Sequence, residues 1–168
     1  MTPSQAEHTP VVRICFLRQA ALIYSENPSG GQAPAFEPST PTAVGIDLRA
    51  CFSETEFSLP PGSRLPIPSG VAIEPVTPGI AGFVYSRSGL GAKHGLVVAQ
   101  GVGVIDPDYR GEIMVWLLNT SGQALLVKQG ERIAQLAFQP YARPRIVIAD
   151  HLSETLRGSG GFGHTGRF

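Results

Sequence analysis

The abundance of glycine and proline constrains the fold of this chain more than any other feature. Its 168 residues include 20 glycines and 15 prolines, and no segment keeps a helical spacing of apolar residues for three turns. Both residue types interrupt helices and favour turns between short extended segments. A chain of this length is expected to form one hydrophobic core. The sequence therefore predicts a single all-β domain, a sandwich or jelly roll, with one short helical turn at residues 88–94.

Runs of branched and aromatic residues, separated mostly by turns that carry glycine or proline, supply the expected strands. Trp116 lies in one of these runs and is expected in the core. The segment 27–42 is rich in proline and lacks an apolar pattern, which predicts an exposed loop. The expected strands cover residues 11–17, 71–75, 82–86, 96–100, 112–119, 124–128, 132–140 and 144–150.

The charges of the chain balance, with 13 basic and 13 acidic residues. A polyanion such as DNA has no bulk electrostatic reason to bind, so we expect no nucleic-acid partner. Any phosphate site must be local, and it must depend on arginine because Lys93 and Lys128 are the only lysines.

The cysteines and the first residues bear on the cellular compartment. Cys15 and Cys51 lack metal-ligand spacing and are expected to be buried thiols. Residues 1–10, which we expect to be flexible, lack the basic and apolar regions of a signal peptide. No apolar run approaches the ~20 residues of a membrane span. We therefore expect a cytoplasmic protein without a membrane partner.

The segment GVGVIDPDYRG at residues 101–111 has the features of a base-binding hairpin. Glycine alternates with valine over residues 101–104, which leaves bare main chain on one face for a flat base. Pro107 turns the chain directly after Asp106, whose apolar neighbours would desolvate its carboxylate and make it a better base. The alternative is that Asp106 and Asp108 only form side-chain hydrogen bonds in the turn.

Two further groups suit phosphate and metal chemistry. Arg87 and Ser88 precede glycines at an expected helix start, where a guanidinium, a hydroxyl and free amides converge on an anion. The same residues are also compatible with ordinary turn chemistry. Asp47 is expected in a strand after Gly45, among apolar residues, where a carboxylate needs a partner. An arginine, such as Arg49, and a metal ion are equally compatible with the sequence.

The tail RGSGGFGHTG at residues 157–166 places Arg157 and Phe162 among glycines, where no core can form. A guanidinium suits phosphate oxygens and an aromatic ring suits stacking on a base, which favours a tail that closes over a nucleotide. A disordered tail is the alternative. The glycines also match a dinucleotide-binding fingerprint, but too few residues follow them to form the required helix.

Together these segments give the chain a specific family resemblance. The hairpin and the tail join three further motifs, AVGIDLRA at 43–50, YSRSGLGAKHGL at 85–96 and GERIAQL at 130–136. The five motifs have the order and spacing of the trimeric dUTPases. The chain resembles that family from residue 11 to its end.

The resemblance implies both a fold and an activity. The fold would be a distorted jelly roll of the β-clip type over residues 1–155, followed by a flexible glycine-rich lid over residues 156–168. The protein would be a homotrimer with shared active sites and would use Mg²⁺. It would hydrolyse dUTP to dUMP and pyrophosphate by attack of water on the α-phosphate. That reaction keeps uracil out of DNA and supplies dUMP for thymidylate synthesis.

The resemblance also implies roles for individual residues. Asp106 would deprotonate the attacking water, and Asp47 would hold Mg²⁺ mostly through coordinated water. Tyr109 would pack against the deoxyribose and exclude a 2′-hydroxyl. Arg157 would bind the γ-phosphate and Phe162 would stack on uracil. The α- and β-phosphates would be bound by Arg87, Ser88, Gly89 and Gln135. The remaining substrate contacts would come from Gln100, Gly103, Val104, Ile105, Met114 and Gly163.

Two other functions are compatible with the same motifs. A dCTP deaminase shares the jelly roll but needs a glutamate that shuttles protons at the base, for which Glu112 and Glu131 are the nearby candidates. A non-catalytic interaction module is the second alternative. The intact set of motif residues argues against that module.

Overall fold

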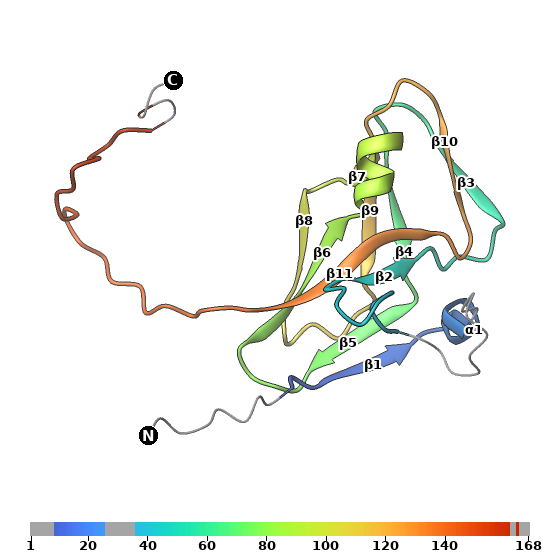
Figure 1. Ribbon diagram of the computed structural model, residues 1–168, viewed down its shortest axis with the longest axis horizontal. Coiled ribbons are helices and arrows are strands. Elements are labelled where there is room, and N and C mark those ends of the chain that lie inside the picture. Colours follow the sequence, from blue (N-terminus) through green and yellow to red (C-terminus); the bar gives the residue numbers. More distant parts are fainter. Residues whose placement is uncertain (1–8, 26–35, 162–163, 165–168) are drawn as a thin grey trace.

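The computed structural model describes residues 9–25, 36–161 and 164. Over these residues the chain is an antiparallel β-structure with one short α-helix, α1 (Ala20–Ser25), and one helical turn, η1 (Leu90–His94) (Figure 1). The strands are β1 (Val12–Phe16), β2 (Ile46–Arg49), β3 (Glu56–Leu59), β4 (Arg64–Pro68), β5 (Val71–Pro75), β6 (Ile80–Ser86), β7 (Leu96–Val98), β8 (Val102–Ile105), β9 (Met114–Asn119), β10 (Leu125–Lys128) and β11 (Arg132–Pro140).

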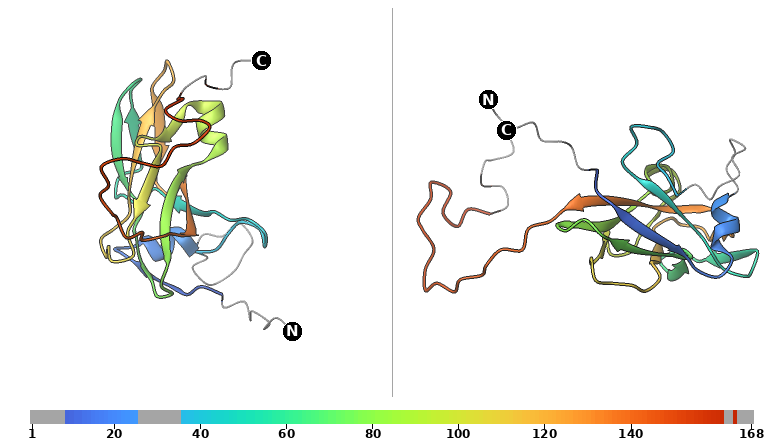
Figure 2. Two further views of the ribbon diagram at one scale, coloured as in Figure 1. Left: turned by 90° about the vertical axis from the view of Figure 1, so that its left-hand side faces the viewer. Right: turned by 90° about the horizontal axis from the view of Figure 1, so that it is seen from below.

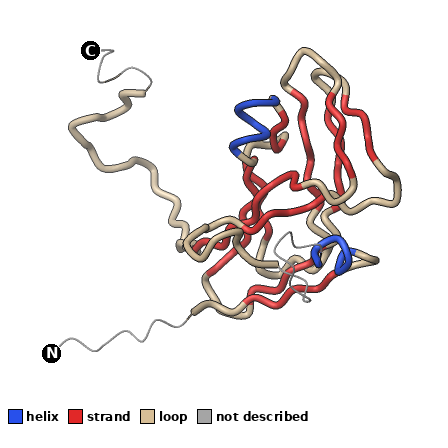
Figure 3. Tube along the Cα trace, turned by 45° about the vertical axis from the view of Figure 1, so that its right-hand side comes forward, coloured by secondary structure: helices blue, strands red, loops and turns tan. Residues whose placement is uncertain are grey.

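The strands form two larger sheets and two strand pairs around one core. One sheet has the order β2-β11-β6-β8, the other has the order β4-β9-β7, and β1-β5 and β10-β3 are the pairs. Alternate residues of the strands point inward, so fully buried side chains come from nearly every strand, for example Leu48, Ile67, Leu117 and Leu136. Figure 3 shows how strands dominate the body of the molecule. The expected all-β jelly roll is confirmed.

Register in the larger sheet brings distant motifs together. Gln135 lies at the centre, opposite Asp47 of β2 on one side and Tyr85 of β6 on the other. The pairing of β11 with β2 shifts between Arg132 and Ala134, which is a β-bulge. Arg87 follows directly after the last residue of β6. The motifs at residues 85–96 and 130–136 therefore meet at the same end of this sheet.

Three elements, α1, β3 and β4, are not among those expected from the sequence. The helix α1 is too short to show a helical period, although Ala20 and Tyr24, four residues apart, are both buried. Strand β4 contains Pro66 and Pro68, which argue against a strand, but β4 lies at the edge of its sheet, where a missing N–H is tolerated. No helix in the described part of the chain is long and apolar enough to cross a membrane.

The prediction of a strand at residues 144–150 is wrong. Residues 141–161 leave the body as an extended segment without regular structure (Figures 1 and 2). Ile146, Val147 and Ile148 are 80%, 73% and 95% exposed. A run of branched residues forms a strand only when a neighbouring strand accepts its hydrogen bonds, and this segment has no such neighbour among the described residues of its own chain.

Two burial expectations are also wrong. In β9 the residues Val115 and Leu117 point into the core, so Trp116 points outward and is 46% exposed. Cys15 is exposed for the same reason, because it occupies an outward position of β1, whereas Cys51 is buried as expected. Strand alternation decides which residue of an apolar run is buried, and the run itself does not show the phase.

Candidate active site

A cavity of about 240 Å³ lies between β8, the turn that follows it and the start of β9. Its lining includes Val84 of β6 and Val98 of β7, so both of the larger sheets contribute to it. The apolar walls and the edge of β8 suit a flat heterocycle. The cavity brings together Gln100, Gly103, Val104, Ile105, Asp106, Tyr109 and Met114, which are the residues that the hairpin motif predicts.

Gly103 shapes the floor of this base cavity. A Cβ atom at this position would lie 3.3 Å from Nε2 of Gln100 and 3.2 Å from Cβ of Val84. The glycine therefore leaves room for the Gln100 amide beside the main chain of β8. Gly101 has a different role from the one expected, because it forms the preceding turn with φ of +81° and does not belong to the bare face of β8.

Asp106 lies at the rim of the base cavity and is exposed. The expected apolar enclosure of its carboxylate is not formed within the described part of this chain. Ile105 and Pro107 flank Asp106 in sequence, but neighbouring side chains of an extended segment point to opposite sides and do not enclose one another. The turn itself is closed by main-chain atoms, since the Tyr109 amide donates to the Asp106 carbonyl over 3.0 Å.

Tyr109 closes one side of the base cavity. Its ring lies over Gly111, where an added Cβ atom would overlap the Tyr109 hydroxyl oxygen. That hydroxyl donates a hydrogen bond of 3.0 Å to the main-chain carbonyl of Glu112. Tyr109 is 44% exposed and lines the cavity.

A second cavity of about 330 Å³ lies at η1 and is lined mainly by polar groups. It brings Arg87, Ser88, Gly89 and Gln135 together, as the phosphate-binding prediction requires. The helical turn expected at 88–94 is confirmed, and it adds two lining residues that the sequence reasoning did not assign, Lys93 and His94. Their signal in the sequence is the four-residue spacing between Gly89 and Lys93, which places both on one side of a helical turn.

The Asp47 carboxylate lies between two arginines. Its Oδ1 atom is 2.9 Å from Nε of Arg87, and its Oδ2 atom is 3.4 Å from Nη1 of Arg132. The geometry of the first contact is that of an ion pair without an aligned hydrogen bond. Arg49 is not the partner, since its Nη1 donates to the carbonyl of Gly130 over 2.9 Å. The arginines that contact Asp47 are therefore Arg87 and Arg132.

Arg132 is a third residue that the sequence reasoning did not assign, after Lys93 and His94. It lies in the motif at residues 130–136, and its side chain contacts Asp47 from β11. Its main-chain carbonyl accepts a 3.1 Å hydrogen bond from Nη1 of Arg87. This bond orients the Arg87 guanidinium, whose side chain is 29% exposed. A carboxylate held between two guanidiniums fixes both arginines in place, which prepares them for an anion.

The residues predicted to bind a metal ion, and those of the predicted lid, do not form a cluster in the part of the chain that the structure describes. In the residues that the structure describes, no three acidic, histidine or cysteine side chains come together as a metal site. Arg157 lies in the extended tail, where its Nε donates to the Gly160 carbonyl over 2.8 Å. Phe162 and Gly163 lie outside the described residues.

Both glutamates that a deaminase could use are engaged by other groups. The Glu112 carboxylate accepts hydrogen bonds from Arg18 and from the Gly70 amide, and the Glu131 carboxylate accepts one from the Lys128 amide over 2.9 Å. A proton shuttle needs a carboxylate that is free to contact the base, and each of these two carboxylates is already held by other groups of the protein. The deaminase alternative is therefore not favoured.

Comparison with known proteins agrees with the motifs. A family model described as dUTPase matches residues 31–166. A deoxyuridine 5′-triphosphate nucleotidohydrolase of Desulfitobacterium hafniense is 49% identical over 128 residues, which is 76% of this chain and 84% of that protein. The dUTPase of Staphylococcus bacteriophage 80alpha, solved with dUPNHPP, aligns with a TM-score of 0.72 at 25% identity, over 94% of this chain and 99% of that one.

A third comparison concerns a metal. A mutant dUTPase of phage phi11 of S. aureus, whose structure reveals coordination of a structural Mg(II) ion, aligns with a TM-score of 0.66 at 19% identity. The alignment covers 86% of this chain and 99% of that one, and it shows a shared fold. From the family model and the curated relative, we conclude that this chain belongs to the dUTPase family.

Proposed function

We propose that this protein hydrolyses dUTP to dUMP and pyrophosphate, and that it acts in the cytoplasm on free nucleotide. The observation that carries the proposal is the pairing of a base-sized cavity on β8 with a second cavity built from Arg87, Ser88, Gly89 and Gln135. The first suits a pyrimidine and the second suits an anion. Both coincide with motifs of a family whose named members act on this nucleotide.

In this proposal the base cavity recognises uracil and deoxyribose. The main chain of β8, which is an edge strand of its sheet, and the Gln100 amide supply hydrogen-bond donors and acceptors for the edge of the base. Val104 contributes main-chain atoms, because its side chain lies on the outer face of β8, while the Ile105 side chain lies beside the base and Met114 beside the sugar. Tyr109 packs on the deoxyribose, so that a 2′-hydroxyl finds no room.

The polar cavity binds the α- and β-phosphates. Arg87 is already oriented by Asp47 and by the Arg132 carbonyl, so little side-chain entropy is lost when the anion arrives. Ser88 and the Gly89 amide add neutral donors from the start of the helical turn, and Lys93 adds a second charge at the same cavity. These groups stabilise the charge that develops on the phosphate oxygens during in-line attack.

Asp106 is the base that accepts a proton from the attacking water. Its exposed carboxylate at the cavity rim is accessible to a water beside the α-phosphate. The turn is held by main-chain atoms, so the carboxylate does not serve the turn and is free for chemistry.

Mg²⁺ fits this site together with the triphosphate. One carboxylate between two arginines cannot hold a bare cation, but Mg²⁺ keeps several waters and takes phosphate oxygens, so Asp47 would contact it through a coordinated water. When bound, the ion neutralises charge on the phosphate chain. Asp47 then serves two partners, the ion and the arginine pair.

A homotrimer would complete the site. The two cavities share no lining residue, and a single nucleotide must reach both. The outer faces of β8 and β9 expose Val102, Val104 and Trp116, and the tail exposes its own run of branched residues at 146–148. Apolar surface of this extent is typical of a subunit interface. The lid over residues 156–168 would close on a neighbouring subunit, with Arg157 at the γ-phosphate and Phe162 on uracil.

One assay tests the proposed reaction. The purified protein is incubated with Mg²⁺ and, separately, with dUTP, dCTP, dTTP or UTP, while pyrophosphate and ammonia are measured. We expect pyrophosphate from dUTP with little from the other nucleotides. Release of ammonia from dCTP without pyrophosphate from dUTP would overturn the proposal in favour of the deaminase, and no turnover at all would favour the interaction module.

A further inference from the structure

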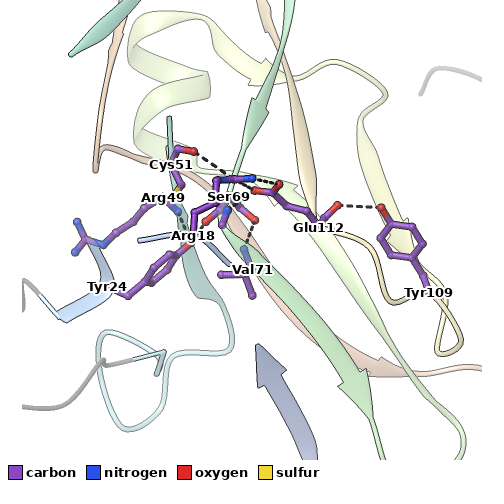
Figure 4. Close-up of polar contacts among 9 residues, drawn as sticks. Arg18, Tyr24, Arg49, Cys51, Ser69, Val71, Tyr109 and Glu112 are labelled. Atoms are coloured by element: carbon purple, nitrogen blue, oxygen red, sulfur yellow. Dashed lines mark hydrogen bonds and ion pairs between the residues drawn. The ribbon is translucent and has the colours of Figure 1, made fainter. Parts of the chain in front are cut away.

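Glu112 is held from two directions at the edge of the base cavity (Figure 4). Its Oε1 atom accepts a hydrogen bond of 2.6 Å from the Gly70 amide. Its Oε2 atom accepts one of 2.9 Å from Nη1 of Arg18, and Nη2 of the same guanidinium contacts Oε1. The Glu112 side chain is only 15% exposed. A bidentate arginine together with an amide leaves this carboxylate a single orientation.

Arg18 adopts an unusual backbone conformation to make this contact. Its φ is +53°, and among the described residues it is the only non-glycine residue with a positive value. A conformation of this kind persists where surrounding contacts hold it. Here the contacts are the pair with Glu112 and a 3.5 Å contact from Nη2 to the Cys51 carbonyl. The strain therefore indicates that the pair matters to the fold or to the site.

The main chain of Glu112 carries the connection to the substrate cavity. Its carbonyl is the acceptor of the Tyr109 hydroxyl, over 3.0 Å. Figure 4 shows the resulting line of contacts, in which Arg18 and Tyr109 lie on opposite sides of Glu112. The contacts of the Glu112 side chain thus hold the Glu112 main chain in place, and the Glu112 carbonyl in turn holds the Tyr109 hydroxyl.

From this geometry we infer that Arg18 and Glu112 are positioning residues that hold Tyr109 against the deoxyribose and thereby set the preference for dUTP over UTP. The inference rests on the proposed function, because Tyr109 is the group through which the pair acts. Arg18 lies 94 positions before Glu112 in the chain, so an N-terminal segment outside the five motifs would contribute to sugar selectivity.

The test measures kcat and KM for dUTP and UTP in a set of variants. Arg18→Gly removes the guanidinium and keeps a residue that adopts positive φ freely, so the backbone is preserved. Glu112→Gln keeps the size but turns one acceptor oxygen into a donor that faces Gly70 or Arg18. Arg13→Ala is the matched control, since it removes a different arginine–glutamate pair of the N-terminal segment, with Glu74, on the exposed surface.

We expect both variants of the pair to lower the dUTP/UTP ratio of kcat/KM by about 5-fold to 20-fold, as for the loss of one oriented contact. The loss should lie mainly in KM for dUTP, because the Asp106 turn is closed by its own main-chain bond. Arg13→Ala should leave the ratio unchanged. In a Tyr109→Phe background, Glu112→Gln should change the ratio by less than about 2-fold, because the hydroxyl bond through which it acts is already gone.

Three results would overturn the inference. An unchanged ratio in Arg18→Gly and Glu112→Gln, while Tyr109→Ala lowers it, leaves the proposed function standing and removes the pair from it. An equal effect of Glu112→Gln with and without the Tyr109 hydroxyl shows a general loss of structure. An unchanged ratio in Tyr109→Ala rejects the role of Tyr109 itself. If Glu112→Gln does not fold, Arg18→Gly decides alone, because it retains the bond between Glu112 and Gly70.

Discussion

Two glycines with the same φ angle should respond very differently to substitution by alanine. Gly62 and Gly70 both have φ of +71°. A Cβ atom at Gly62 would have no atom within 4 Å. At Gly70 it would overlap Cβ of Ala20 and lie 2.7 Å from Sγ of Cys51, and these two residues are 0% and 2% exposed. The pair therefore separates backbone strain from steric overlap at constant φ.

The expected magnitudes follow from these contacts. A left-handed conformation costs alanine about 1–2 kcal/mol relative to glycine, and Gly62→Ala should lose only that much. Gly70→Ala adds overpacking of the core, which costs about 1–3 kcal/mol because α1 and the Cys51 segment must move apart. The loss for Gly70→Ala should therefore be about 2–5 kcal/mol. A domain of ordinary stability survives this loss, so both variants can be measured.

Urea unfolding at one fixed protein concentration measures the difference, since the stability of an oligomer depends on concentration. Both variants should keep the slope of the unfolding transition while the midpoint falls further for Gly70→Ala. Equal losses of stability in the two variants would show that Ala20 and Cys51 can move away from an added methyl group without a loss of free energy of unfolding. That result would refute the close packing described here.

Three further predictions concern the reaction and its pH range. Asp106→Asn should lower kcat by on the order of 10²–10⁴ while KM changes by less than about tenfold, and unchanged turnover would remove this carboxylate from the mechanism. A chain truncated after Ser153 should fold but lose most turnover and discriminate less between dUTP and dUDP, since Arg157 is missing; turnover at the full-length rate would refute the lid. Burial raises the pKa of the Tyr24 hydroxyl, so the unfolded chain loses this proton first as pH rises. The contribution of Tyr24 to the free energy of unfolding should therefore be complete below about pH 10 and should fall above it. Urea unfolding at several pH values measures this fall, and a steeper fall in Tyr24→Phe than in the unchanged protein would contradict the expected direction.

The parts of the fold that follow from sequence are those whose signal is local. Runs of branched and aromatic residues predict β5, β6, β9 and β11, and glycine with proline predicts the turns between them. The edge strand β4 could not be found this way, because its prolines are tolerated only at a sheet edge, and edge position is a property of the whole sheet.

The base cavity could be predicted for the same reason. Its predicted lining residues all lie between Gln100 and Met114, so a single hairpin positions most of them. The exposure of Asp106 and the orientation of Tyr109 could not be predicted, because both depend on which way the turn after β8 faces. The Glu112 carboxylate is held in turn by Arg18, a residue from another part of the chain.

The sequence by itself therefore determined the all-β class, the family motifs and the identity of the base hairpin, because short-range spacing carries each of them. The tertiary structure alone decided which partners the charged groups take. Asp47 lies between Arg87 and Arg132 because the register of β2, β11 and β6 places three distant segments side by side. It also decided that residues 144–150 form no strand, because hydrogen-bond partners for a strand must come from a neighbour, and branched residues cannot supply them.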